Sequence, residues 1–294
     1  MKKDKRAGLP LLTATLDRRT FLGAAAALAV PALAAAPNVV GVQLYTVREV
    51  LPRDPLATLQ ALERIGYREA ELTSDRLDAV MAAIQKTTLK PVSLHMDFML
   101  FMHNQDRLPA ALADATSRGF QYVVCPYVLP ADRGGAEVAK RLAETLNKAG
   151  EASRKLGMRL CYHNHAFDFA PAGDQTLLDV LLYGSDPDLV GLELDIMWAA
   201  VAGVDPVSVL KTYGKRVSML HLKNVAPGIA KRYNEDLPPS AFREVGNGVV
   251  DVPAVLAAAA QAGVQHYFVE QDKTPGDPLV SLTESYRYLE KLNQ

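Results

Sequence analysis

The sequence has few of the residues that build disulfide scaffolds or nucleic-acid surfaces. Its 294 residues include only two cysteines, Cys125 and Cys161, which are too few for a disulfide-based fold. We expect two buried thiols, because free cysteine is commonly a core residue, with a disulfide between them as the alternative. Lys and Arg number 32 against 33 Asp and Glu, for a net charge of −1. This balance argues against a nucleic-acid partner, since such domains usually carry a basic face.

The sequence also lacks a hydrophobic run long enough to cross a membrane. The apolar stretch that begins at Phe21 has about 15 residues, whereas a transmembrane helix needs roughly 20. It follows Arg18-Arg19 and ends in Ala32-Leu33-Ala34, which has the A-x-A form of a cleavage site. Residues 1–34 therefore resemble a twin-arginine signal peptide, with a disordered or helical tail as the alternative. The resemblance implies export to the periplasm and no stable membrane span.

From residue 39 onward, short apolar segments alternate with amphipathic ones, and no Gly-x-Gly-x-x-Gly follows the first segment. The apolar segments predict strands over residues 39–45, 68–72, 90–95, 120–125, 158–165, 189–195, 217–223 and 265–270. The amphipathic segments predict helices over residues 55–65, 75–86, 106–118, 136–156, 175–183, 206–213, 252–262 and 279–292. Such alternation predicts an α/β fold with a parallel sheet, and eight units suit a single (β/α)8 TIM barrel over residues 38–294. A doubly wound open sheet is the alternative, weakened by the missing glycine motif.

Ligand-type side chains gather at the ends of the predicted strands. In a (β/α)8 barrel the functional site lies at the carboxyl ends of the strands. The residues at these ends are Glu71, His95, His163, His165, Glu193, Asp195, His221, Lys223 and Glu270. Any one of them could be a helix cap, an ion pair or a core hydrogen-bonding group. However, four of the chain's six histidines lie at these ends, and it is this coincidence that predicts a functional site.

The chemistry of this set suits a divalent metal. Mixed histidine and carboxylate ligands favour Mn, Co, Ni, Fe or Zn over Ca or Mg alone. A metal there polarises a carbonyl group and orients the substrate, and nearby carboxylates or histidines move a proton on the adjacent carbon. Lys223 is placed to stabilise the enediolate oxygen that forms. Trp198 is either core packing or a wall against a sugar ring.

Several short motifs, taken together and in order, resemble the xylose isomerase-like TIM barrel superfamily, and more narrowly its sugar phosphate isomerase/epimerase proteins, which are relatives of inosose dehydratase and ketose 3-epimerases. The resemblance covers the chain from about residue 38. The motifs are Gly41-Val42-Gln43-Leu44-Tyr45-Thr46-Val47-Arg48, Tyr162-His163-Asn164-His165, Leu194-Asp195 with Trp198, His221-Leu222-Lys223, Val245-Gly246-Asn247-Gly248 and Val269-Glu270-Gln271-Asp272.

The resemblance implies one divalent metal, most often Mn, with Co, Fe, Ni, Zn or Mg as alternatives. Its ligands would be Asp195, His221 and Glu270, and His163 stands where the epimerases carry a glutamate. That departure leaves two possibilities open: His163 is a ligand, or His163 and His165 supply the group that transfers the proton. The full set of predicted roles is catalytic for His163, His165, Lys223 and Glu270, metal-binding for His163, Asp195, His221 and Glu270, and substrate-binding for Glu71, His95, Glu193 and Trp198.

The expected function is a divalent-metal-dependent sugar isomerase or epimerase. A neutral sugar or keto-sugar is the expected substrate, because the sequence shows no Gly-rich phosphate cradle. A lyase or hydratase acting on 3-keto-glycosides or keto-sugars is the first alternative, and a non-catalytic periplasmic sugar-binding protein is the second. An endonuclease IV-like phosphodiesterase is disfavoured by the acidic balance. The resemblance also suggests a homo-oligomer.

Overall fold

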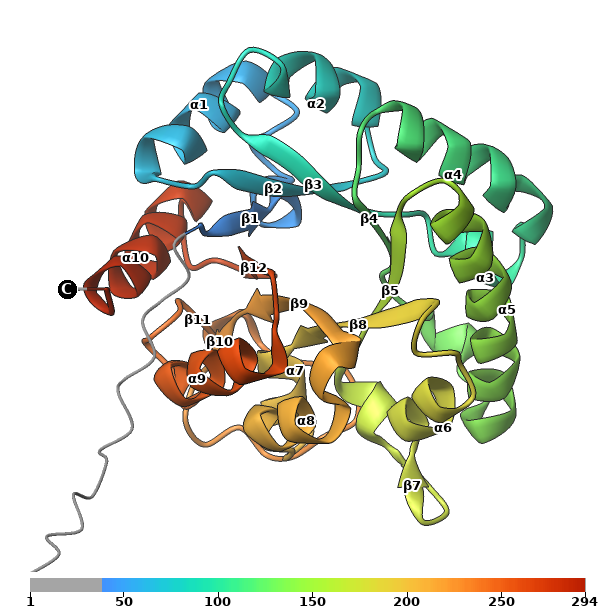
Figure 1. Ribbon diagram of the computed structural model, residues 1–294. Helices are drawn as coiled ribbons and strands as arrows, with labels where there is room; N and C mark the ends of the chain where they lie inside the picture. The colour runs from blue at the N-terminus through green and yellow to red at the C-terminus, as the bar shows by residue number, and fades with distance from the viewer. Residues whose placement is uncertain (1–38, 294) are drawn as a thin grey trace, which may run out of the picture. The chain divides into compact units, whose positions relative to one another are not determined.

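A computed structural model describes residues 39–293. Eight parallel strands form a closed barrel in the order β1-β12-β9-β8-β5-β4-β3-β2, and helices surround it (Figure 1). The barrel confirms the predicted (β/α)8 fold and excludes the open-sheet alternative. The predicted signal segment, residues 1–34, lies outside the described residues. Within them, no helix is both long and apolar enough to cross a membrane.

The barrel strands are short and almost wholly buried, as expected of strands covered by helices on one side and filled by side chains on the other. They are β1 (Gly41–Gln43), β2 (Glu69–Thr73), β3 (Lys90–His95), β4 (Tyr122–Cys125), β5 (Arg159–His163), β8 (Val190–Asp195), β9 (Val217–Leu222) and β12 (His266–Val269). Two small hairpins lie outside the barrel, formed by β6 (Pro171–Ala172) with β7 (Gln175–Thr176) and by β10 (Asn224–Val225) with β11 (Phe242–Arg243).

The helices are α1 (Pro55–Ile65), α2 (Leu77–Ile84), α3 (Met99–Met102), α4 (Leu108–Ser117), α5 (Gly135–Lys155), α6 (Leu177–Tyr183), α7 (Ile196–Val201), α8 (Pro206–Tyr213), α9 (Val252–Ala262) and α10 (Pro278–Lys291). Four of them, α1, α8, α9 and α10, begin with an aspartate cap and a proline in the first turn. The aspartate accepts a hydrogen bond from a free backbone N–H, and proline needs no such partner there.

Two helices, α3 and α7, were not predicted from the sequence. The helix α7 follows directly on β8, and its N-cap is Asp195, whose Oδ1 accepts a hydrogen bond from the backbone N–H of Trp198 at 2.9 Å. The same carboxylate therefore ends a barrel strand and starts a helix. This cap fixes the orientation of the Asp195 side chain at the rim of the barrel.

The interior of the barrel has an apolar floor below its polar rim. Six buried side chains form this inner cluster: Val92, Tyr122, Val124, Cys161, Met219 and Phe268. Phe268 packs below the candidate site, with its ring centroid 6.4 Å from that of His221. Cys125 lies in the separate core cluster, and both cysteines are free and buried, as predicted.

Phe268→Ala is expected to lower the free energy of unfolding by about 3–5 kcal/mol, because it removes a fully buried aromatic ring and leaves a cavity. A Cβ atom at Gly41 would lie 2.4 Å from the Phe268 ring, so glycine at that position is what lets the ring pack so closely. Urea denaturation checks the prediction. The exposed Val280→Ala is the control, with an expected change within about 0.5 kcal/mol. An equal loss of unfolding free energy in Phe268→Ala and Val280→Ala would contradict the claim that the Phe268 ring is a tightly packed part of the barrel interior.

Candidate metal centre

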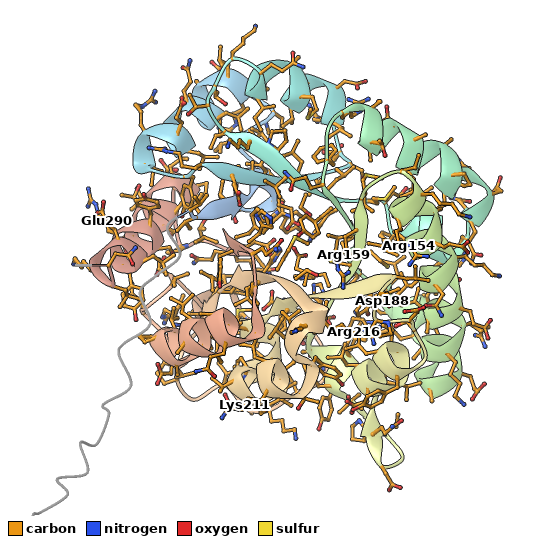
Figure 2. The ribbon with its side chains drawn as sticks, viewed as in Figure 1. Arg154, Arg159, Asp188, Lys211, Arg216 and Glu290 are labelled. Atoms are coloured by element: carbon orange, nitrogen blue, oxygen red, sulfur yellow. The ribbon has the colours of Figure 1, made fainter. Side chains whose placement is uncertain are left out.

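The strand register brings the predicted side chains together at the carboxyl end of the barrel. His163 on β5 is paired with Glu193 on β8, and Asp195 on β8 with His221 on β9. Residues paired across parallel strands project to the same side of the sheet. Arg159, Asp188 and Arg216, labelled in Figure 2, lie at the amino ends of β5, β8 and β9, and so mark the opposite end of the barrel.

Four buried groups form what we call the outer set: His163, Asp195, His221 and Glu270. Each offers one ligand atom, and these atoms all lie within 4.8 Å of one another. Nε2 of His163 is 3.8 Å from Oδ2 of Asp195, and Nδ1 of His221 is 2.8 Å from Oε2 of Glu270. These are the four residues predicted as metal ligands, and they come from three neighbouring strands and the segment after β12.

Lys223 supplies positive charge to the outer set. Its Nζ lies 2.9 Å from Oδ2 of Asp195, 2.5 Å from Oε2 of Glu270 and 3.1 Å from Oδ2 of Asp272. Burial alone would lower the pKa of Lys223, but the three carboxylates raise it well above its ordinary value. Burial raises the pKa of Asp195 to about 6. Protons will therefore compete with a metal for Asp195 as the pH falls through about 6.

Two fully buried carboxylates, Glu71 and Glu193, lie against the histidines of the outer set, and we call them the inner carboxylates. Oε2 of Glu193 is 3.1 Å from Nδ1 of His163, and Oε1 of Glu71 is 2.6 Å from Nε2 of His221. Each of these histidines thus faces an outer carboxylate with one nitrogen and an inner carboxylate with the other. Carboxylates in that position orient metal-binding imidazoles and fix which nitrogen carries the proton.

His95 joins the two inner carboxylates. Its Nε2 is 2.7 Å from Oε2 of Glu193 and 3.0 Å from Oε1 of Glu71. Gln43 Nε2 also donates a hydrogen bond to Oε1 of Glu71, at 2.8 Å. The predicted contacts of Glu71, His95 and Glu193 with the substrate stay a prediction. These side chains lie against the ligand histidines, and His95 and Glu193 also form, with His163 and His221, a second group whose donor atoms lie within 4.8 Å of one another.

The donor groups fit a divalent metal. Four buried polar atoms of this cluster make no hydrogen bond: Glu71 Oε2, His163 Nδ1, Glu193 Oε1 and Asp195 Oδ2. Lys223 is close to Asp195 Oδ2 as an ion-pair partner but is not aligned to donate to it. Buried polar atoms without partners are costly and uncommon in proteins. A cation shared by the outer set would satisfy Asp195, and nitrogen with carboxylate ligands suits Mn, Fe, Co, Ni or Zn.

Glu193→Gln is expected to weaken metal binding by about 10–100-fold, the usual effect of losing a carboxylate that orients a ligand histidine. The variant keeps the size of the side chain and removes its charge beside His163. Competition with a chelating dye measures the affinity. Glu69→Gln is the matched control, because Glu69 pairs with His266 at the other end of the barrel. Equal metal affinities for the two variants would refute the orienting role.

His165 and Trp198 lie beside the outer set and outside it. The sequence predicted a strand through His165, but β5 ends at His163, and His165 is the N-cap of the 3-10 helix Ala166–Phe169. Asp168 causes this turn by accepting the backbone N–H of His165 at 2.7 Å. The His165 ring stacks on Trp198, with the ring centroids 5.7 Å apart. Residues two apart share a face only within a strand. Because β5 ends at His163, His165 does not share a strand face with it.

Sequence reasoning missed the residues that surround His165. Tyr127 packs edge-on against the His165 ring at 4.8 Å. Arg133 lies over the Phe167 ring at 3.7 Å and pairs with Glu235 at 3.0 Å. Glu235 belongs to the long loop after β10, far from Arg133 in sequence. No motif marks such a contact, because it depends on how two loops fold back over the barrel.

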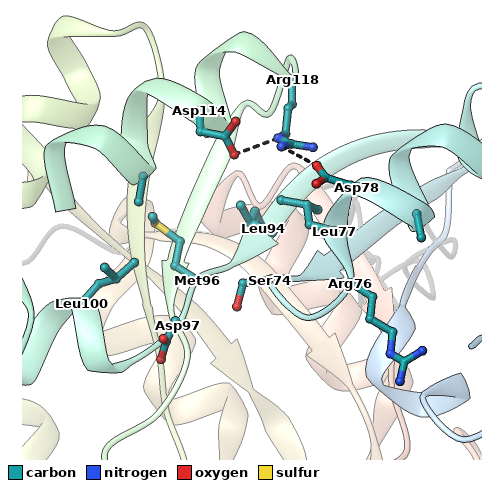
Figure 3. Close-up of a pocket in the computed structure, with 12 residues that line it drawn as sticks. Ser74, Arg76, Leu77, Asp78, Leu94, Met96, Asp97, Leu100, Asp114 and Arg118 are labelled. Atoms are coloured by element: carbon teal, nitrogen blue, oxygen red, sulfur yellow. Dashed lines mark hydrogen bonds and ion pairs between the residues drawn. The ribbon is translucent and has the colours of Figure 1, made fainter. Parts of the chain in front are cut away.

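A separate cavity of about 600 Å³ lies against α2, β3 and α4 (Figure 3). Leu77, Leu94 and Leu100 line it, and Arg118 bridges Asp78 and Asp114 at its edge, with N–O distances of 2.7 and 2.8 Å. It shares no lining residue with the outer set, Lys223 or the inner carboxylates. We therefore assign the chemistry to the barrel rim rather than to this cavity.

Comparison with known proteins gives a consistent picture. A profile described as xylose isomerase-like TIM barrel matches residues 59–292. An inosose dehydratase from Lacticaseibacillus casei is 27% identical over 163 residues, which cover 51% of this chain and 53% of that protein. The match thus spans about half the length of this curated relative.

Two solved structures show the same fold. A sugar phosphate isomerase/epimerase from Parabacteroides distasonis superposes with a TM-score of 0.72 at 21% identity, covering 86% of this chain and 97% of that one. A structure described as IOLI protein with a binding zinc atom superposes with a TM-score of 0.65 at 17% identity, covering 86% and 96%.

Proposed function

The chain belongs to the xylose isomerase-like TIM barrel family, and we propose that it is a divalent-metal-dependent enzyme that removes a proton from the carbon beside a carbonyl group of a sugar or keto-sugar. The observation that carries this proposal is the convergence of His163, Asp195, His221 and Glu270 around one point, with Lys223 beside them. The zinc atom named for one structural relative supports a metal in such a barrel.

The outer set would hold the metal, and the metal would polarise the substrate carbonyl as a Lewis acid. Glu71 is hydrogen-bonded to Nε2 of His221, and Glu193 lies 3.1 Å from Nδ1 of His163, so each carboxylate faces the ring nitrogen opposite the outer set. The Lys223 ammonium is fixed among three carboxylates and stabilises negative charge that develops on the carbonyl oxygen. Because it is already oriented, it needs little reorganisation during the reaction.

Of the three carboxylates around Lys223, Asp272 is the one that does not belong to the outer set. Its side chain is 20% exposed and therefore accessible to solvent. Burial raises its pKa above the ordinary value, while Lys223 opposes that change. A raised pKa brings a carboxylate closer to the strength that a general base needs near neutral pH. We propose that Asp272, which lies 3.1 Å from Nζ of Lys223 and reaches solvent, accepts the substrate proton, and that Glu270 remains a ligand.

Proton removal beside a carbonyl begins isomerisation, epimerisation and elimination alike. The inosose dehydratase relative favours elimination of water from a keto-sugar as the overall reaction, ahead of the isomerase or epimerase reaction predicted from the sequence. A non-catalytic sugar-binding protein would need neither the outer set nor its two orienting carboxylates.

Proton exchange tests the proposal. The protein would be incubated in D2O with a panel of sugars and 3-keto-sugars, with metal and with chelator, and followed by NMR. Metal-dependent loss of one substrate C–H signal is the expected result. An unsaturated product with new ultraviolet absorbance would identify elimination, and an epimer or ketose would identify isomerisation. Absence of exchange for the whole panel with a fully metal-loaded protein would contradict the proposal.

We also propose that residues 1–34 direct export to the periplasm. Replacement of Arg18 and Arg19 by lysine, followed by fractionation of cells, tests this. Retention of the double variant in the cytoplasm is expected, and unchanged export would refute the twin-arginine assignment.

A further inference from the structure

The amino end of the barrel carries a group of cationic side chains that the candidate metal centre does not use. Two cavities lie there, of about 430 and 350 Å³, and both are lined by Tyr122, Arg159 and Asp188. We call these two adjoining cavities the amino-end pocket. The cationic side chains that line it are Arg154, Arg159, Lys215 and Arg216. Four positive charges thus face one carboxylate, Asp188, in a chain whose net charge is −1 (Figure 2).

Arg159 is the first residue of β5, and its side chain is fixed in the wall of this pocket. Its Nε donates to Oγ of Ser218 at 2.9 Å, and its Nη2 donates to the backbone oxygen of Pro187 at 3.2 Å. Gly191 on β8 leaves room for this arrangement, because a Cβ atom there would lie 2.7 Å from Ser218 Oγ and 2.9 Å from Arg159 Nε. Nη1 of Arg159 makes no hydrogen bond within residues 39–293 and carries two N–H groups.

Arg216 is a second half-buried guanidinium in the same pocket. It donates to three backbone oxygens and one serine hydroxyl, and none of its hydrogen bonds among the described residues goes to a carboxylate. Burial lowers the pKa of Arg216, and the charge of nearby Arg159 adds to that effect, although Tyr213 and Asp186 oppose it. Charged groups removed from water are usually paired with an opposite charge. Two neighbouring guanidinium groups without one point to an anionic ligand.

We propose that the amino-end pocket binds a small phosphate-bearing anion, either inorganic phosphate or the phosphate group of a small metabolite. The guanidinium fork matches the geometry of phosphate oxygens, and Nη1 of Arg159 is available to donate. Lys215 is exposed and adds a second mobile charge. Gln265 adds an amide NH2 group, because its Oε1 already accepts the Tyr122 hydroxyl at 3.1 Å. Four cations favour a doubly charged anion over a singly charged carboxylate.

The shape of the pocket suits a phosphate with a short organic group attached. The cavity of about 350 Å³ contains Lys215 and Arg216 and would hold the phosphate. The cavity of about 430 Å³ continues from it along Met158 and Leu189, which offer apolar surface. Asp188 is exposed, so water and salt screen its repulsion of an anion.

The amino-end pocket is independent of the candidate metal centre. It shares no lining residue with the outer set and lies at the other end of the same strands. The proposal therefore goes beyond the proposed function and does not rest on it. A neutral substrate at the metal and a phosphate-bearing ligand at the amino end can be bound at the same time.

Calorimetric titration of the metal-loaded protein with inorganic phosphate and with glycerol 3-phosphate tests the proposal. Sodium chloride keeps the ionic strength constant, so that general screening does not contribute to the signal. Saturable binding is expected. Tighter binding of glycerol 3-phosphate would identify a phosphate ester as the ligand, and equal affinities would identify free phosphate.

Arg159→Gln is expected to weaken phosphate binding by about tenfold or more, because hydrogen bonds between charged groups are the strong ones. Lys215→Gln changes an exposed side chain and therefore preserves the fold, and it should weaken binding by about two- to fivefold. Lys211→Gln is the matched control. Lys211 is an exposed lysine on α8 that lines neither cavity, so its replacement should leave phosphate affinity unchanged.

Thermal unfolding gives a second readout, because a ligand that binds only the folded state raises the melting temperature. Phosphate should raise it for the unaltered protein and for Lys211→Gln, and much less for Arg159→Gln. Three results would each overturn the proposal: no saturable binding of either phosphate compound, equal phosphate affinity in Arg159→Gln, Lys215→Gln and Lys211→Gln, or binding that is lost when a chelator removes the metal. None of them would affect the proposed function, which is tested at the other end of the barrel.

Discussion

Asp195→Asn should cost the protein its bound metal while leaving the barrel folded. The substitution keeps Oδ1, which accepts the Trp198 backbone N–H and caps α7. It replaces the fully buried Oδ2, which makes no hydrogen bond, and removes the negative charge. Losing a group behind a ligand typically costs about 10–100-fold in metal affinity, so losing a charged ligand should cost more than that.

Metal content after dialysis and competition with a chelating dye measure this effect, and circular dichroism checks the fold. Asp205→Asn is the matched control, because Asp205 caps α8 by accepting a backbone N–H and lies outside the outer set. Wild-type metal affinity in Asp195→Asn would mean that the outer set does not hold the metal.

Lys223→Met should abolish most of the turnover while metal affinity stays the same or rises. Nζ of Lys223 lies against Asp195 and Glu270, which supply two of the four donor atoms of the outer set. The ammonium therefore competes with a metal for these carboxylates, and its removal relieves the competition. The same ammonium stabilises the developing oxyanion, and loss of one such group usually lowers kcat by about 10²–10³-fold.

A purely structural residue would lower both metal affinity and turnover when it is replaced. Lys223→Met is instead expected to lower turnover without lowering metal affinity. Initial rates with the substrate found by proton exchange give kcat, and dye competition gives the metal affinity. Lys211→Met on α8, labelled in Figure 2, is the control and should change neither quantity. If Lys223→Met turned over as fast as Lys211→Met, the assigned role would be wrong.

The fold was predictable because two kinds of signal agree along the chain. Apolar strands alternate with amphipathic helices, and Asp-Pro pairs mark the starts of α1, α8 and α10. The strand ends carry Asp195 and His221 on adjacent strands, and the barrel register then brings them together. Knowledge of the strand order alone therefore places most of the outer set.

The remaining parts of the site depend on three-dimensional packing. Glu71 and Glu193 have the same sequence appearance as the predicted ligands, and only the three-dimensional structure shows that they lie against His221 and His163. His165 was misplaced because Asp168 ends the strand early. The contact between Arg133 and Glu235 joins two loops separated by about a third of the chain, a pairing that no local pattern encodes.

Elemental analysis of the protein, purified without chelator, tests the central claim most directly. About one equivalent of Mn, Fe, Co, Ni or Zn per chain is the predicted result, since the four ligands of the outer set would hold one ion, and the second group of donors shares His163 and His221 with it. A protein that contains no metal, and takes up none when each of these ions is added back, would contradict the account.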